Sequence, residues 1–276
     1  MKLEKNDLSG FFSKCSVQDG RIKKQISFHS IDEYNLYVNV LKCDIEKVFD
    51  YYRKLSKARV DMPQMIRCTY ENGFCSICQE YIDGISLSNW ICSNDIYKTL
   101  DKHLAFFKSL LDNQKQIFIV DNKLRIDFNL RNFIVKNDVL YLVDIMPPIF
   151  IDEEVKERSK QFNNKIFRLI ELYSNINYQI VSMIGYWFLD CLNNLSRIAE
   201  PLRRVVIDNI LSVFIKESNK YLASYNMECR CIEKAFIYQN ADNYFFRRVF
   251  LLYEYIDENI QFEKLVYLFN IRMHSD

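Results

Sequence analysis

The residues best suited to chemistry are Asp127, Asn132 and Asp144, which lie in one stretch rich in apolar, strand-forming residues. Their carboxylate and amide oxygens are hard ligands of the kind that Mg²⁺ takes in proteins. A carboxylate can also accept a proton from an attacking hydroxyl. Each residue alone would most often cap a turn or end a strand. Their joint spacing favours a site that holds Mg²⁺ and a polyphosphate, and hence phosphoryl transfer.

The first 84 residues are expected to form a small, mostly antiparallel β lobe with one helix. Asp19-Gly20 and Asn72-Gly73 are turn signals between runs rich in β-formers, so each predicts a hairpin. Asp44 is placed to cap a helix whose apolar face carries Ile45, Val48, Phe49, Tyr52 and Leu55. The predicted strands are 11–17, 21–28, 34–41, 64–70 and 74–82, and the predicted helix is 44–58.

Beyond this lobe the apolar spacing becomes helical, apart from two short hairpins. The fold class is therefore predicted as α+β, with lobes at 1–84 and 85–276 and a hinge at Asp83-Gly84. The hairpins join 117–120 with 124–126 and 133–135 with 140–143. The predicted helices are 94–111, 153–173, 178–197, 201–225, 229–238, 242–257 and 261–272.

The composition of the 276 residues narrows the class of protein. A 49% hydrophobic content with 15% aromatic residues excludes a disordered chain. Because 37 basic residues are balanced by 36 acidic ones, the chain has no large overall basic charge and nucleic-acid binding is not expected. The most apolar run, 180–192, is short for a bilayer and contains Asp190, so no membrane association is expected. A cytoplasmic protein with reduced thiols is the resulting interpretation; the oligomeric state is not indicated.

The motif Asp127-x4-Asn132, followed by Leu142-Val143-Asp144, resembles the protein-kinase-like superfamily. The order of elements is similar to its small-molecule branch, the aminoglycoside phosphotransferase and choline kinase type. The resemblance implies a bilobal fold, ATP and Mg²⁺ as cofactors, and a small hydroxyl- or amine-bearing substrate. It also implies that Asp127 is the catalytic base and that Asn132 and Asp144 are the metal ligands.

The nucleotide side of the site follows from the same resemblance. Residues 79–87 are similar to the hinge whose backbone groups hold the adenine, which assigns Glu80 and Ile82 to cofactor binding. Lys42 matches the lysine that steadies the α- and β-phosphates, with Glu46 as its partner. That pair is four residues apart, closer than in the family, so Lys23 or Lys24 is the alternative source of charge.

The chain departs from the family at three places. Arg125 replaces the usual His, residues 145–148 (Ile-Met-Pro-Pro) replace Phe-Gly, and the phosphate-covering turn has the single glycine Gly20. These departures keep two alternatives open. One is a pseudokinase that binds a nucleotide or a partner protein without catalysis, and the other is a different transfer such as adenylylation.

Cysteine and histidine offer weaker candidates. Cys75 and Cys78 have the spacing of a metal-binding pair, with Cys229 and Cys231 as further thiols. Residues three apart on a strand point to opposite faces, so a zinc site is not favoured. His103 is expected at the surface or boundary of the 94–111 helix.

Overall fold

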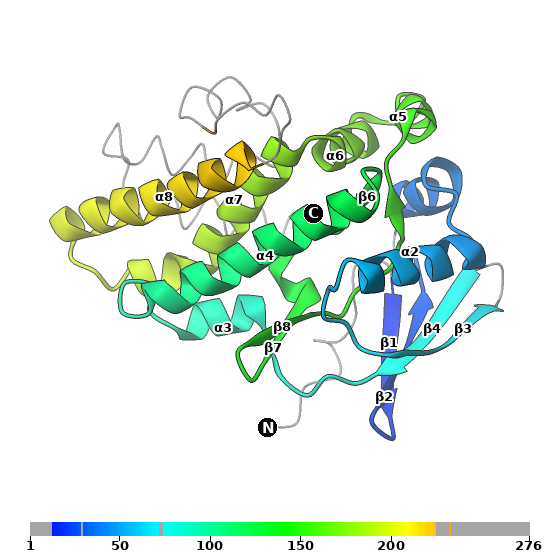
Figure 1. Ribbon diagram of the computed structural model, residues 1–276, viewed down its shortest axis with the longest axis horizontal. Coiled ribbons are helices and arrows are strands. Elements are labelled where there is room, and N and C mark those ends of the chain that lie inside the picture. The colour runs from blue at the N-terminus through cyan, green and yellow to red at the C-terminus, as the bar shows by residue number, and fades with distance from the viewer. Residues whose placement is uncertain (1–12, 29, 72–73, 225–231, 233–276) are drawn as a thin grey trace. The chain divides into compact units, whose positions relative to one another are not determined.

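The computed structural model describes residues 13–28, 30–71, 74–224 and 232 (Figure 1). The chain divides into two compact units, each considered by itself. The first contains residues 1–85, 113–127 and 132–174, and the second contains 86–112, 128–131 and 175–276. A mixed α+β class is confirmed. The first segment of the first unit, 1–85, nearly matches the expected first lobe, 1–84. The unit's other two segments, 113–127 and 132–174, fall in the range expected for the second lobe.

A four-stranded antiparallel sheet forms the β part of the first unit. Its strands lie in the order β1 (Ser13–Gln18), β2 (Arg21–Ile26), β4 (Phe74–Glu80) and β3 (Met65–Glu71). Both hairpins are confirmed. Asp19 and Gly20 adopt φ values of 50° and 70°, the left-handed conformation that an Asp-Gly turn supplies. Arg21 lies opposite Glu80, so this turn lies at the C-terminal end of β4.

The strand predicted at 34–41 is wrong, because the chain is helical there. α1 (Ile31–Tyr34) continues into a π-helical segment, Asn35–Val40. Ser30 caps the start, its Oγ accepting a hydrogen bond from the Glu33 N–H at 3.2 Å. Local β-propensity is overridden by burial, since helical spacing places a set of apolar residues in one core. These residues are Leu36, Val40 and Leu41, and they pack with buried residues farther along the chain: Ile149, Ile151, Val155, Ile166, Ile170 and Tyr173.

Helix α2 (Ile45–Lys57) begins where the sequence predicts. Asp44 Oδ1 accepts a hydrogen bond from the Lys47 N–H at 2.8 Å, which confirms the predicted cap. The buried face is rotated from the predicted one, and Phe49 is 47% exposed. The residues that α2 buries are Val48, Tyr51 and Leu55.

Two short antiparallel pairs carry the candidate site. β6 (Leu124–Arg125) pairs with β9 (Ile149–Phe150), and β7 (Phe133–Lys136) pairs with β8 (Val139–Leu142). The latter hairpin was predicted and is confirmed. β5 (Ile85–Ser86) lies beside β7 in the same sheet as β8.

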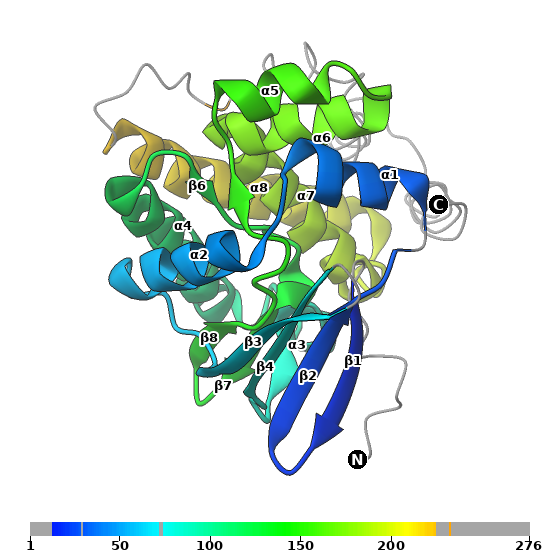
Figure 2. The ribbon, with the colours of Figure 1, turned by 90° about the vertical axis from the view of Figure 1, so that its right-hand side faces the viewer.

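The remaining described elements are helices. The strand predicted at 117–120 is wrong, since α4 (Leu100–Val120) continues through it. The helix predicted at 153–173 is two helices, and Figure 2 shows both beside the helical segment 31–40. Most of the last three predicted helices lies outside the described residues. The other helices are α3 (Leu87–Ser93), α5 (Glu153–Ser159), α6 (Asn164–Ser174), α7 (Ile176–Leu195) and α8 (Glu200–Ala223).

The second unit has an aromatic core that includes a histidine. His103 is 0% exposed, so its predicted surface or boundary position is wrong. Trp187 Nε1–H donates to His103 Nδ1 at 3.1 Å, and the Trp90 ring lies 4.9 Å from the imidazole, centroid to centroid. Across the described helices, none is both long and apolar enough to cross a bilayer.

Candidate functional site

An ion pair between Lys24 and Asp144 lies at the centre of the candidate site. Lys24 Nζ is 3.1 Å from Asp144 Oδ1 and donates a hydrogen bond to the Val143 carbonyl oxygen at 2.8 Å. Gln79 Nε2 donates to the same carbonyl at 2.8 Å. The Lys24 and Asp144 side chains are 8% and 17% exposed. The structure therefore joins the sheet to the residue that the sequence assigns to metal binding.

The position of Lys24 follows from the alternation of β2. Ile22, Lys24 and Ile26 lie on the buried face of the strand, and their neighbours in sequence are exposed. Ile22 lies opposite Gln79 in the ladder with β4. A lysine in the apolar phase of a strand needs a partner for its charge. Lys24 alternates in step with Ile22 and Ile26, and Lys23 does not. This alternation is the sequence signal that distinguishes the two lysines.

Lys42 lies in a different setting. The third strand that was expected to end at Lys42 is absent, and Lys42 follows the helical segment 31–40 with a φ of 50°. Its side chain is exposed, as is that of Glu46 on α2. The premise for the Lys42–Glu46 pair is therefore wrong, and Lys24 is the lysine that the structure brings to Asp144.

Asp127 and Asn132 lie at the two ends of a short loop. Hydrogen bonds link Asn132 to Asp127 and to Val143. Asn132 Nδ2 donates to the Asp127 carbonyl oxygen at 3.4 Å, a long hydrogen bond. The Val143 N–H donates to the Asn132 carbonyl oxygen at 2.9 Å. These bonds place Asn132 beside the residue that precedes Asp144. Its amide nitrogen faces the backbone, so the amide oxygen is the atom suited to a cation.

The buried hydroxyl of Tyr51 feels the negative charge of both Asp127 and Asp144. Burial first, and then the negative charges of Asp127 and Asp144, raise the pKa of Tyr51 well above its ordinary value. Both carboxylates therefore act electrostatically on one hydroxyl. The convergence of Asp127 and Asp144 on a shared metal ion stays a prediction.

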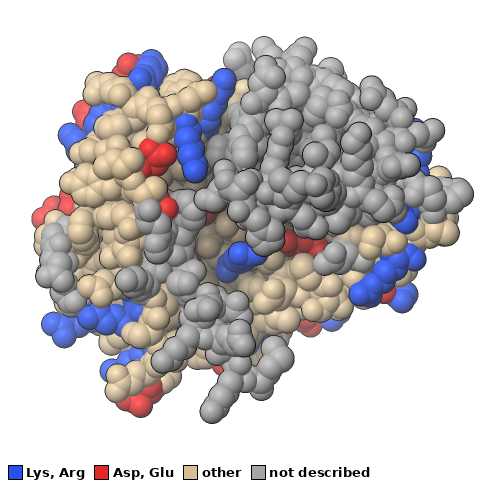
Figure 3. Space-filling model, turned by 180° about the vertical axis from the view of Figure 1, so that it is seen from behind, with Lys and Arg blue, Asp and Glu red and all other residues tan. Residues whose placement is uncertain are grey.

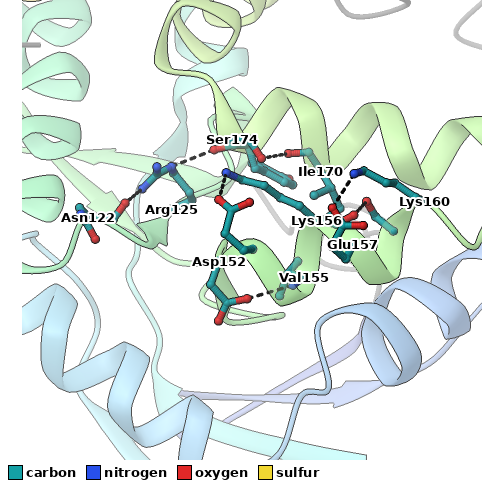
Figure 4. A network of polar contacts seen from close by, with 12 residues as sticks. Asn122, Arg125, Asp152, Val155, Lys156, Glu157, Lys160, Ile170 and Ser174 are labelled. Carbon is teal, nitrogen blue, oxygen red and sulfur yellow. Dashed lines mark hydrogen bonds and ion pairs between the residues drawn. The ribbon is translucent and has the colours of Figure 1, made fainter. Parts of the chain in front are cut away.

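Arg125, which stands where the resemblance would place a His, makes hydrogen bonds to three backbone carbonyl groups. Its Nε donates to the Tyr173 carbonyl oxygen at 2.8 Å, and its Nη1 donates to the Asn122 and Leu124 carbonyl oxygens, each at 2.7 Å. Figure 4 shows the guanidinium between Asn122 and the end of α6. The side chain therefore fastens β6 to α6.

The segment after Asp144 is a short buried connection. All four residues of the Ile-Met-Pro-Pro run at 145–148 are buried, and they lead directly into β9. The Met146-Pro147 peptide bond is cis. This packing holds the backbone that follows the acid.

The residues predicted to form the hinge lie at the end of β4 and just after it. The Glu80 N–H donates to the Gln64 carbonyl oxygen and the Tyr81 N–H to the Gly20 carbonyl oxygen, both at 2.9 Å, while Ile82 is buried. The β1–β2 turn therefore lies beside Tyr81, within the predicted hinge segment. Lys24 lies farther along β2, and the role of the Gly20 turn in covering the phosphates stays a prediction.

Two further groups singled out in the sequence are the thiols and the basic residues of α5 (Glu153–Ser159). Cys75 is buried on β4, whereas Cys229 and Cys231 lie outside the described residues. In the portion that the structure describes, no three His, Cys, Asp or Glu side chains gather in a way that could hold a metal. The basic residues of α5 form ion pairs such as Lys156–Glu153, and Figure 3 shows basic and acidic side chains interspersed on one face.

Comparison of the chain with protein-family models, curated proteins and solved structures found no match. The case for a function therefore depends on the described side chains and their geometry.

Proposed function

We propose that the chain is an ATP- and Mg²⁺-dependent phosphotransferase acting on a small metabolite with a hydroxyl or amine acceptor. The observation that carries the proposal is the ion pair between Lys24 and Asp144. It unites a nearly buried cation with one of the acids predicted to bind metal. Charge neutralisation of a polyphosphate needs this combination, because phosphoryl transfer depends chiefly on positioning and electrostatics.

The donor set at the site fits magnesium. Asp144 offers a charged oxygen, and Asn132 offers a neutral amide oxygen because its nitrogen donates to the Asp127 backbone. Magnesium keeps several waters and takes further ligands from phosphate, so two protein ligands suffice. When bound, the ion would neutralise phosphate charge, with Asn132 and Asp144 as its protein ligands.

Lys24 takes the role that the resemblance gave to Lys42. Its ammonium has three N–H donors, of which Val143 O and Asp144 Oδ1 take two. A phosphate oxygen can take the third while the contact with Val143 keeps the side chain in place. The backbone of Glu80, the last residue of β4, and of Ile82, two residues farther on, would hold the adenine.

Asp127 would receive the acceptor's proton. The acceptor oxygen or nitrogen forms a bond to the γ-phosphorus, and the bond from that phosphorus to the β–γ bridging oxygen breaks. The electron pair of the broken bond leaves on ADP, and the acceptor's proton passes to the Asp127 carboxylate. The proposal includes the kinase-like lobes: residues 1–84 bind the nucleotide, and 85–276 carry the catalytic and metal-binding loops.

Paired variants test the two roles. We expect ATP with Mg²⁺ to stabilise the wild-type chain, by about 2.7 kcal/mol when ATP is at 100 times its Kd. Asp144→Asn should lose the Mg²⁺-dependent part of this stabilisation. Asp127→Asn should retain it but lose turnover by roughly 10²–10⁴-fold, the usual contribution of a positioned base. Thermal denaturation and ADP release measure the two effects.

The control removes a carboxylate elsewhere. Asp101 is exposed on α4, so Asp101→Asn should leave both binding and turnover unchanged. Full turnover in Asp127→Asn would show that the base is another residue. A wild-type chain that gains no stability from ATP and Mg²⁺ would overturn the proposal.

The buried connection after Asp144 favours a second candidate, nucleotide binding without catalysis. Its burial ties the metal-binding acid to a fixed backbone, where the family has Phe-Gly. This candidate predicts stabilisation by ATP that does not depend on Mg²⁺ and is not followed by ADP release. The same two measurements distinguish it from the phosphotransferase.

A further inference from the structure

A tyrosine outside the family motif holds the chain at the approach to Asp127. Tyr51, on α2, is 2% exposed, and its hydroxyl donates a hydrogen bond to the Arg125 carbonyl oxygen at 2.7 Å. Its ring meets the Phe150 ring edge-on, with centroids 5.7 Å apart. The ring contact and the hydrogen bond together fix the orientation of the Tyr51 side chain.

The hydrogen bond is made at a sensitive point of the backbone. Arg125 ends β6 and stands two residues before Asp127, so a constraint on its carbonyl limits how the loop departs from the strand. Burial and the charges of Asp127 and Asp144 keep the pKa of Tyr51 well above its ordinary value. The phenol therefore stays protonated and remains a donor throughout the neutral range.

A second contact of α2 reinforces the same attachment. Lys54, one turn after Tyr51, forms an ion pair with Asp121 at 2.7 Å, just before β6. Its Nζ also lies 4.9 Å from the centre of the Phe150 ring. Helix α2 thus holds the β6–β9 pair at neighbouring points, and Tyr51 is the point nearest to Asp127 in sequence.

We propose that Tyr51 is a positioning residue that holds Asp127 in place through the Arg125 carbonyl. This role rests on the proposed function of Asp127 and extends it to α2. Tyr51→Phe removes the donor and retains the ring that packs against Phe150. The Arg125 carbonyl then loses a buried hydrogen bond, and the approach to Asp127 becomes freer to move.

Tyr52 provides a matched control on the same helix. Its hydroxyl accepts a hydrogen bond from the Met65 N–H at 3.1 Å and donates to the Pro63 carbonyl oxygen at 3.4 Å. Tyr52→Phe therefore removes a comparable hydroxyl whose partners precede or begin β3. Both substitutions keep an aromatic ring on α2.

Amide hydrogen exchange of the free, full-length chain tests the inference without a substrate. We expect Tyr51→Phe to speed exchange in a peptide spanning residues 124–133 by about tenfold, the loss of one ordinary buried hydrogen bond. Tyr52→Phe should leave that peptide unchanged. Equal exchange in Tyr51→Phe and the wild type, or an equal effect of both variants, overturns the positioning role.

Turnover separates this inference from the proposed function. With ATP and Mg²⁺, Tyr51→Phe should lower the kcat for ADP release about tenfold and change the KM for ATP less than twofold. If the wild type neither binds nor turns over ATP while Tyr51→Phe alone loosens residues 124–133, the hold on Asp127 stands and the phosphotransferase proposal fails. If the wild type turns over and Tyr51→Phe matches it in kcat and exchange, the positioning role fails alone.

Discussion

Removal of the Lys24 charge should destabilise the first unit, for reasons visible in the site. Lys24→Met keeps most of the apolar stem and deletes the ammonium that contacts Asp144 Oδ1 and the Val143 carbonyl oxygen. Asp144 is then left 17% exposed with that cation gone. Gln79 Nε2 still donates to the Val143 carbonyl, so the loss falls mainly on the carboxylate.

The expected magnitude follows from the burial of the pair. Deletion of one partner from a fully buried ion pair costs roughly 3–5 kcal/mol. Water retains some access to Asp144, so we expect Lys24→Met to lower the free energy of unfolding by about 2 kcal/mol. Asp144→Asn should also be destabilising. The double variant Lys24→Met/Asp144→Asn should lose less stability than the sum of the two single losses, by a coupling energy of about 1–2 kcal/mol.

Urea denaturation of the full chain measures these differences. Both tryptophans, Trp90 and Trp187, belong to the second unit, so their fluorescence is a poor probe here. Circular dichroism and the exchange of β2 and β4 amides include the first unit. Lys23→Met is the control, because Lys23 is exposed on the same strand, and it should change stability by less than about 0.5 kcal/mol. Equal losses in Lys24→Met and Lys23→Met would refute the reasoning.

Two further perturbations test the packing around the site and in the second unit. Burial lowers the pKa of His103 to about 4, against an opposing effect of the Asn94 backbone, whereas an unfolded histidine titrates near 6.5. The unfolded chain therefore binds the extra proton between these values, and the contribution of His103 to stability should be constant above pH 6.5 and fall by about 3 kcal/mol as the pH drops to 4. Comparison of urea denaturation at several pH values should show a weaker dependence in His103→Gln, and identical slopes would contradict this account. At Gly84, in the predicted hinge, an added Cβ would lie 2.6 Å from the Val135 carbonyl oxygen, a backbone atom that cannot rotate away. Gly84→Ala should cost about 1–3 kcal/mol in urea denaturation, whereas Gly20→Asn, in an open turn that tolerates asparagine, should be nearly neutral; similar effects of the two substitutions would argue against the close approach.

The sequence predicts best where local chemistry decides the structure. The Asp19-Gly20 turn needs left-handed backbone, and Asp44 offers an oxygen to the first turn of α2; both predictions are confirmed. The β7–β8 hairpin is confirmed for the same reason. In each case residues adjacent in the chain supply the deciding contact.

Prediction fails where distant contacts override local preference. Residues 34–41 favour a strand by propensity, yet burial against α5 and α6 makes the segment helical. His103 looks polar in sequence and is buried by two tryptophans from other helices. Neither outcome can be read from neighbouring residues.

The residues of the candidate site also differ in how far the sequence alone indicates them. Asp127, Asn132 and Asp144 are predicted from residue type and spacing, which the chain carries in one stretch, and their roles stay predictions. Lys24 was only one of two alternatives to Lys42, although its place in the apolar phase of β2 distinguishes it from Lys23. Tyr51 was missed because the predicted face of α2 was rotated by one position, which favoured Tyr52.

A crystal soaked with ATP and Mn²⁺, which replaces Mg²⁺ and scatters anomalously, tests the central claim most directly. The account predicts a Mn²⁺ peak in contact with an Asn132 amide oxygen and an Asp144 carboxylate oxygen, with phosphate oxygens completing the shell and Lys24 Nζ on a phosphate. A nucleotide bound with its phosphates away from these three residues would contradict it. So would a saturating soak that leaves neither metal nor nucleotide beside Asp144.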